Sequence, residues 1–146
     1  MNVVKVSQQD YPALIMIWEA SVPATHHFLP EPYIAKLKPL ILEHYFDAVM
    51  LSAVKQGNEV AGFIGVADGN IEMLFVHPDF FGQGLGRALT LYAIQHLGAS
   101  KVDVNEQNPQ AIGFYEKMGF KRIGRSALDG QGNPFPLIHM AIETAQ

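Results

Sequence analysis

The spacing of apolar residues along this chain alternates between a helical period and a strand period. The clearest helical stripe is Leu14, Ile17, Trp18 and Val22, which recur three and four positions apart. The predicted helices span about Asp10 to Val22, Glu31 to Phe46, Gly84 to Leu97 and Asn108 to Met118. Pro39 should break or kink the second helix, because proline removes a hydrogen-bond donor and clashes with the preceding turn.

Short apolar and β-branched runs between turn residues predict strands. Gly57-Asn58 separates two of them and indicates a hairpin. The predicted strands are Val3–Val6, Val49–Lys55, Val60–Ala67, Ile71–His77, Lys101–Asn105, Lys121–Leu128 and Phe135–Ile142. The order is therefore βααββ followed by βαβαββ. This order predicts an α/β (α+β) fold in which a mixed twisted β-sheet is flanked by helices, with residues 1–146 forming a single domain.

A glycine-rich turn joins the fourth strand to the third helix. Its glycines alternate as G-x-G-x-G, and such a turn lets backbone N–H groups approach a phosphate while the helix dipole favours negative charge. The pattern lacks the third glycine of the dinucleotide motif and the G-K-[S/T] of the phosphate loop. We therefore expect a pyrophosphate site of another kind; the alternative is an ordinary turn, which needs fewer glycines. The residues of the turn are Gly82, Gln83, Gly84, Leu85, Gly86 and Arg87.

A second motif follows the fifth strand. Residues 108–120 read N-x-x-A-x-x-F-Y-x-x-x-G-F, which alone is also typical of a capped amphipathic helix that a glycine ends. At this separation the two motifs resemble the GNAT family of acetyl-coenzyme A dependent N-acetyltransferases. The resemblance is close from about Ile71 to Phe120. Residues 24–29 and 124–137 are also similar to a small bacterial subgroup of lysine acetyltransferases.

The resemblance implies a GNAT-like fold with splayed central strands and a role for each motif. The backbone of the glycine-rich turn would hold the coenzyme A pyrophosphate. The backbone of Leu74, Phe75 and Val76 would pair with the pantetheine arm like an added strand, with an N–H near Leu74 or Phe75 aimed at the thioester oxygen. Asn108 would contact the coenzyme, and Tyr115 would protonate the leaving thiolate. The family prefers Arg or Gln at the position of Phe81, so we expect weaker coenzyme binding.

The general base is less clearly marked. Glu72 lies two residues before Leu74, which corresponds to about 7 Å along a strand, and would relay the amine proton through water. It should share the face of Leu74 unless a bulge intervenes. Asp103 on the next strand is the second candidate, and either carboxylate could instead be a solvated strand residue.

The histidines divide into two groups. His26 and His27, with Phe28, lie in the loop that borders the acceptor site in this family. Only one of the two histidines can face that site well, and His26 is taken with Phe28 as the candidate. The others stand without a partner pattern and are expected to be structural or surface residues. They are His44, His77, His96 and His139. No metal site is expected, because no H-E-x-x-H motif or carboxylate cluster accompanies the histidines.

Composition removes several other classes of function. The net charge of −4 argues against nucleic acid as a partner, because no basic face would follow the phosphates. The chain has no cysteine, which excludes disulfides, cysteine-based zinc sites and a cysteine nucleophile. No apolar run reaches the ~18 residues of a membrane span and no secretory signal is visible, so the expected location is the cytoplasm.

The expected function is therefore acetyl transfer from acetyl-coenzyme A to a primary amine. A protein lysine is one candidate acceptor; a small amine such as an antibiotic, an amino acid or a polyamine is the alternative. A second alternative is a non-catalytic coenzyme A binding module. The chain contains nine Phe and five Tyr, and this content of large apolar residues is compatible with a homodimer.

Overall fold

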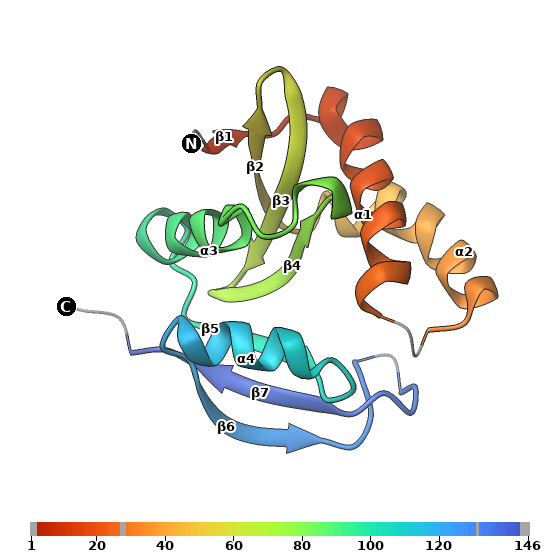
Figure 1. Cartoon of the computed structure of the whole chain (residues 1–146). Helices are drawn as coiled ribbons and strands as arrows, with labels where there is room; N and C mark the ends of the chain where they lie inside the picture. The colour runs from red at the N-terminus through yellow and green to blue at the C-terminus, as the bar shows by residue number, and fades with distance from the viewer. Residues whose placement is uncertain (1–2, 27–28, 131, 144–146) are drawn as a thin grey trace.

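A computed structural model describes residues 3–26, 29–130 and 132–143 (Figure 1). Within these residues four α-helices and seven strands follow one another in the predicted order. They are β1 (Val3–Lys5), α1 (Tyr11–Thr25), α2 (Glu31–Leu40), β2 (Met50–Gln56), β3 (Glu59–Ala67), β4 (Asn70–Val76), α3 (Leu85–His96), β5 (Lys101–Asn105), α4 (Pro109–Lys117), β6 (Lys121–Ser126) and β7 (Leu137–Ala141). The strands form one sheet of order β1-β2-β3-β4-β5-β7-β6, in which only β4 and β5 are parallel. The predicted mixed sheet flanked by helices is confirmed.

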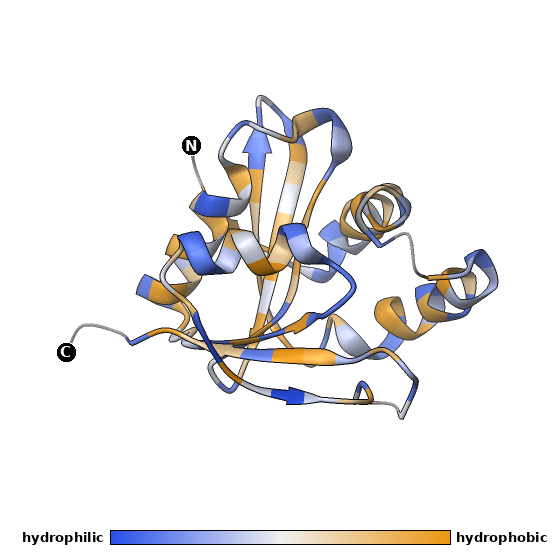
Figure 2. Ribbon diagram, turned by 60° about the horizontal axis from the view of Figure 1, so that its bottom comes forward, coloured by the Kyte–Doolittle hydropathy of each residue, from blue (hydrophilic) through white to orange (hydrophobic). Residues whose placement is uncertain are grey.

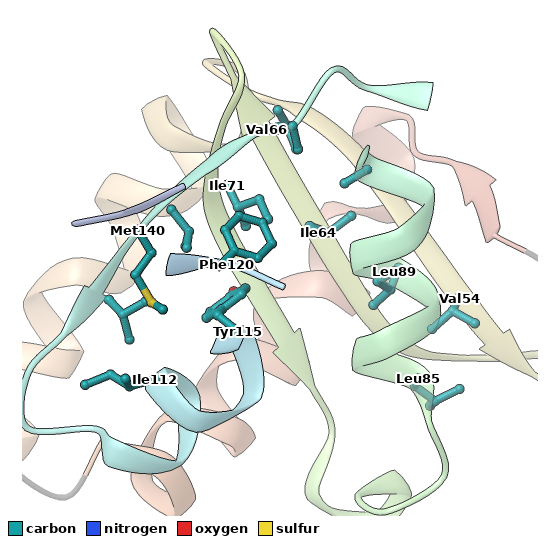
Figure 3. Close-up of a cluster of buried hydrophobic side chains, with 14 of the residues drawn as sticks. Val54, Ile64, Val66, Ile71, Leu85, Leu89, Ile112, Tyr115, Phe120 and Met140 are labelled. Atoms are coloured by element: carbon teal, nitrogen blue, oxygen red, sulfur yellow. The ribbon is translucent and has the colours of Figure 1, made fainter. Parts of the chain in front are cut away.

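Helices cover both faces of the sheet, and a hydrophobic core lies on each. One core joins α3 and α4 to β3, β4 and β5 through residues such as Ile64, Leu89 and Tyr115 (Figure 3). The other joins α1 and α2 to the opposite face, with Trp18 and Phe63 among its members. The adjacent residues Phe63 and Ile64 of β3 thus serve different cores, as expected for a strand buried on both faces. In Figure 2 hydrophobic segments run along both the strands and the helices.

The predicted stripe of α1 is buried, but the helix ends later than expected. Leu14, Ile17, Trp18 and Val22 are each less than 5% exposed. The chain remains helical through Pro23 to Thr25, whereas the sequence predicted a helix that ends at about Val22. Pro23 has no N–H to donate within the helix, but the next turn still closes, because the His26 N–H donates to the Val22 carbonyl at 2.7 Å.

The helix changes type shortly after Pro39. The α-helical segment α2 ends at Leu40, and residues Ile41–Tyr45 continue as a π-helix. Of the predicted break or kink at Pro39, the break does not occur, because α2 continues through Pro39 and the chain stays helical beyond it. The last two strands are shorter than predicted: β6 ends at Ser126, and β7 begins at Leu137. Among the described residues no helix is both long and apolar enough to span a bilayer.

Candidate functional site

The centre of the sheet opens between β4 and β5. These strands pair at only two positions, Asn70 with Lys101 and Ile71 with Val102. Beyond them the strands diverge, and the divergence is visible as the gap between β4 and β5 in Figure 1. The edge of β4 that faces β5 therefore lacks a partner strand over the second half of β4. Unpaired strand edges are sites where an extended ligand can add by backbone hydrogen bonds.

The register with β3 identifies the backbone groups on this open edge. The His77 N–H donates to the Ala61 carbonyl at 2.8 Å. In an antiparallel pair every second residue bonds to the partner strand, so Phe75 also directs its N–H and C=O to β3. Leu74 and Val76 then direct theirs into the gap. Of the two oxyanion donors expected from the sequence, the register favours Leu74 over Phe75.

A groove of about 670 Å³ occupies the splay and continues to the start of α3. Residues from β4, β5, the glycine-rich turn, α4 and the end of α1 line it. Those predicted from the sequence as site residues are His26, Glu72, Leu74, Phe75, Val76, Gly82, Gly84, Leu85, Gly86, Arg87, Asn108 and Tyr115. Residues separated by almost 90 positions thus line one continuous groove.

The glycine-rich turn is left-handed at two of its three glycines. Gly82 has φ 78° and Gly84, the N-cap of α3, has φ 80°. Nothing lies within 4 Å of a β-carbon built on either residue, so both backbones border open space. Gly86 has an ordinary φ, and a β-carbon there would contact the Phe114 ring at 3.6 Å. Two glycines therefore suffice for the conformation of the turn.

The start of α3 provides donors for an anion. The first N–H bonded within the helix belongs to Ala88, which donates to the Gly84 carbonyl at 3.0 Å. The N–H groups of Leu85, Gly86 and Arg87 have no partner within the helix, as in the first turn of any helix. These three residues line the groove. Backbone N–H groups at the positive end of a helix dipole form a phosphate-binding arrangement.

Tyr115 reaches the groove from α4 through the hydrophobic core. Its side chain lies against the rings of Phe114 and Phe120, at centroid distances of 5.1 and 5.5 Å, and only 5% of the residue is exposed. Burial raises the pKa of the Tyr115 hydroxyl well above its ordinary value of 10.0. The phenol thus stays protonated at neutral pH, and Figure 3 shows it in the core beside Phe120.

Asn108 caps α4 and also lines the groove. Its side-chain oxygen accepts a hydrogen bond from the Ala111 N–H at 3.2 Å and so caps α4. This confirms the predicted cap, and Gly119 ends the helix with φ 103° as expected for a left-handed C′ residue. Because the carbonyl side of the Asn108 amide performs the capping, its NH₂ group remains available as a donor to the groove.

The comparisons with known proteins agree with this geometry. Residues 34–144 match the family model "Acetyltransferase (GNAT) domain". The chain belongs to the GNAT family. It is 39% identical over 140 residues to peptidyl-lysine N-acetyltransferase YjaB of Salmonella typhimurium, covering 96% of this chain and 97% of the relative. It is 40% identical over 128 residues to the protein of that name from Escherichia coli, covering 88% and 87%.

Solved structures of similar proteins have the same fold as this chain. The solution structure of apo YjaB from Escherichia coli superposes with a TM-score of 0.84 at 35% identity, covering 99% of this chain and 98% of the other. The PaiA N-acetyltransferase of Thermoplasma acidophilum, crystallised with coenzyme A, has the same fold, with a TM-score of 0.76 at 20% identity and coverage of 97% and 98%. This GNAT protein is therefore an N-acetyltransferase that uses acetyl-coenzyme A and an amine acceptor.

One predicted site residue of this GNAT chain, Gln83, lies apart from the groove lining. The side chain of Gln83 accepts a hydrogen bond from Gln56 at 3.1 Å, and Gln83 is absent from the lining of the groove. Phe28 lies outside the described residues. His26 does line the groove and stands 6.1 Å from the Phe75 ring, centroid to centroid. Phe81, which replaces the polar residue usual in the family, is 45% exposed at the rim.

Glu72 occupies a bulge in β4. The register with β3 pairs Ile71 with Val66 and Met73 with Gly65, which leaves Glu72 as the extra residue. Ile71 and Leu74 pack in the same core although three positions separate them. The alternation of faces that would have placed Glu72 with Leu74 is therefore interrupted at Glu72 itself. Its exposed side chain still borders the groove.

Sequence reasoning missed the partners of His139. The His139 Nδ1 atom lies 2.5 Å from Asp103 Oδ1, and its Nε2 atom lies 2.6 Å from Ser126 Oγ. The sequence showed no partner pattern for His139, and the structure supplies two partners. His77, whose Nδ1 accepts the Asp79 N–H at 3.1 Å, has the structural role expected of it. The alternation of side chains along the strands could have indicated that Asp103, His139 and Ser126 share a face. Using it required knowing that β7 lies between β5 and β6, which depends on the tertiary structure.

Among the residues that the structure describes, no group of three or more histidines or carboxylates could hold a metal ion.

Proposed function

We propose that this GNAT enzyme acetylates the ε-amino group of lysine side chains in peptides or proteins by direct attack of the amine on acetyl-coenzyme A. The observation that carries the proposal is the identity of 39–40% to two proteins named peptidyl-lysine N-acetyltransferase, which extends over 88–96% of this chain. The groove supports it, because it brings backbone donors, a phenol and carboxylates together between β4 and β5.

The coenzyme binds through the backbone in this proposal. The pyrophosphate lies at the N–H groups of Leu85, Gly86 and Arg87, where the helix dipole compensates its charge. The pantetheine amides pair with the groups of Leu74 and Val76 that face the gap. The thioester then lies near the Leu74 N–H, which stabilises the oxyanion of the tetrahedral intermediate. Asn108 adds a side-chain donor.

The reaction balances without any further reactant. The amine nitrogen uses its lone pair to bond to the carbonyl carbon, and the carbon–sulfur bond breaks with its electrons moving to sulfur. A lysine ammonium has a pKa of ~10.4, so it must lose one proton before attack, and Glu72 at the groove receives that proton through water. The nitrogen loses a second proton as the tetrahedral intermediate collapses to the amide. The thiolate gains one proton, so one proton is released to solvent for each ammonium group that is acetylated.

Tyr115 is the proton donor to the leaving sulfur. Burial keeps the phenol protonated, which is the state that a leaving thiolate requires. The pKa of the free phenol lies above the ~8.5 of a thiol, so the interaction begins as a hydrogen bond to the thiolate. Proton transfer follows as charge accumulates on sulfur, and Tyr115 is reprotonated from solvent.

The test uses acetyl-coenzyme A with a peptide that has a blocked N-terminus and one lysine. Release of free thiol together with addition of one acetyl group at that lysine supports the proposal. The same peptide with arginine in place of lysine is the control. If only spermidine or a free amino acid is acetylated, the acceptor is a small amine. If acetyl-coenzyme A binds but no amine in the panel is acetylated, the protein is a coenzyme-binding module and the proposal is wrong.

A further inference from the structure

Three side chains form a row across the face of the sheet opposite α4. Asp103, His139 and Ser126 come from the adjacent strands β5, β7 and β6. Asp103 and His139 are directly paired in the register of β5 and β7. On β5 the neighbouring residues Val102 and Val104 pack into the core that contains α3 and α4. Because strand residues alternate between faces, Asp103 points away from that core.

This row reaches the groove from the acceptor side. The parts that we assign to the coenzyme, namely the start of α3, Asn108 and Tyr115, lie on the face of α3 and α4. Asp103 lines the groove from the opposite face, where His26 of the segment after α1 also borders it. An amine that meets the thioester in the splay without crossing the coenzyme must enter from this face. Asp103 thus lies on its path.

The hydrogen bonds define what each member of the row can do. An ionised carboxylate only accepts hydrogen bonds, so the His139 Nδ1–H donates to Asp103 Oδ1. The His139 Nε2 atom then faces the Ser126 hydroxyl, which fixes the ring from its other side. Asp103 Oδ2 is left outside this bond. Ser126 does not line the groove, so it is not placed to attack the thioester.

We propose that His139 and Ser126 are positioning residues that hold the Asp103 carboxylate so that its second oxygen binds the ammonium group of the acceptor. The inference rests on the proposed function, because it concerns the acceptor half of the same groove. In this inference the acceptor binds as a cationic aliphatic ammonium group, and Glu72 relays its proton afterwards. Side-chain exposures of 43% for Asp103 and 30% for His139 leave the pair accessible to such a ligand.

The alternative is that the row only ties three strands together. The two roles differ in what they change. A structural tie affects thermal stability and every kinetic constant that depends on the fold. A positioning role affects the Michaelis constant for the amine and leaves the affinity for acetyl-coenzyme A unchanged, because no member of the row lies on the coenzyme face.

The experiment compares Asp103→Asn, His139→Ala and Ser126→Ala, with His139→Asn and Ser126→Thr as conservative partners that retain a donor at the corresponding place. The probe is the blocked single-lysine peptide, and its binding is also measured by calorimetry with coenzyme A present. Arg125→Ala is the matched control: it removes the neighbouring tie of β6 to Glu106, whose side chain does not line the groove.

We expect Asp103→Asn to raise the Michaelis and dissociation constants of the peptide about tenfold or more, since hydrogen bonds to charged groups contribute that much. His139→Ala should raise them roughly three- to tenfold by releasing the carboxylate. His139→Asn and Ser126→Thr should restore most of the loss, and Arg125→Ala should change neither constant.

Equal peptide affinity in the wild type, Asp103→Asn and His139→Ala would overturn the inference, as would parallel losses of peptide and coenzyme affinity with a lowered melting temperature. Wild-type protein that binds the peptide without acetylating it would instead refute the proposed function, while the binding comparison would still decide the role of His139.

Discussion

Tyr115→Phe separates the chemistry of the phenol from its packing. The substitution removes one oxygen and keeps the ring, which contacts Phe114 and Phe120 in the core. Coenzyme affinity should stay close to that of the wild type, because the proposed pyrophosphate and pantetheine contacts come from the backbone. The expected change is therefore in kcat, measured as thiol release from acetyl-coenzyme A with the lysine peptide at saturation.

The magnitude depends on how far the proton moves. A hydrogen bond from Tyr115 to a thiolate contributes about 1.5–3 kcal/mol, which corresponds to a loss of roughly 10- to 150-fold. Full general-acid catalysis contributes about 10²–10⁴-fold. We therefore expect kcat to fall at least tenfold, and a fall beyond about 150-fold would indicate transfer in the transition state. Tyr92→Phe on the outer part of α3 is the matched control and should retain full activity.

The same variant has a second signature in alkaline unfolding. Burial raises the folded-state pKa of Tyr115 above the unfolded value of 10.0. The resulting stability is complete below pH 10 and is lost as the pH rises above 10 toward the folded pKa, at about 1.4 kcal/mol per pH unit. Tyr115→Phe should therefore lose less stability than the wild type above pH 10. Unchanged kcat together with equal alkaline sensitivity would refute both the buried state and the donor role.

Other substitutions test the remaining parts of the groove. Gly84→Ala should weaken acetyl-coenzyme A binding, because a β-carbon at φ 80° costs about 1–2 kcal/mol and enters open space at the turn, whereas calorimetry of Gly86→Ala should show near-normal affinity. Asn108→Asp should keep the cap and the melting temperature but lose a donor and coenzyme affinity, whereas Asn108→Ala should lower stability by about 1 kcal/mol as well. Glu72→Gln should lower kcat/KM mainly at low pH, and a profile identical to the wild type would exclude Glu72 from the proton path.

The parts of the site that are local in sequence could be predicted. The turn at Gly82 and Gly84 follows from glycine conformations, and the cap at Asn108 follows from its side-chain oxygen. Both motifs depend on contacts within a few residues of the chain. The stripe of α1 could be predicted for the same reason, since helical spacing alone determines which side chains share a face.

The parts that depend on strand pairing could not be predicted from residues alone. The bulge at Glu72 exists only relative to the register of β3, and the partners of His139 exist only because β7 lies between β5 and β6. A one-residue difference in register reverses the face of every later residue in a strand. Sequence spacing placed Glu72 on the face of Leu74 only in the absence of a bulge, and the bulge interrupts the alternation at that residue.

The structure changes how strongly the third glycine of the turn supports a phosphate site. Three alternate glycines favoured a phosphate site because they exceeded what a turn needs. The turn itself accounts for Gly82 and Gly84, and Gly86 has an ordinary φ with Phe114 beside it. The number of glycines alone thus argues less for coenzyme binding than it did in the sequence. The stronger argument is positional: unpaired N–H groups at the start of α3 and the open edge of β4 line one groove, and strand pairing created that arrangement. Near-normal coenzyme affinity in Gly86→Ala would support this view. A complete loss of affinity would show that all three glycines are needed for coenzyme binding.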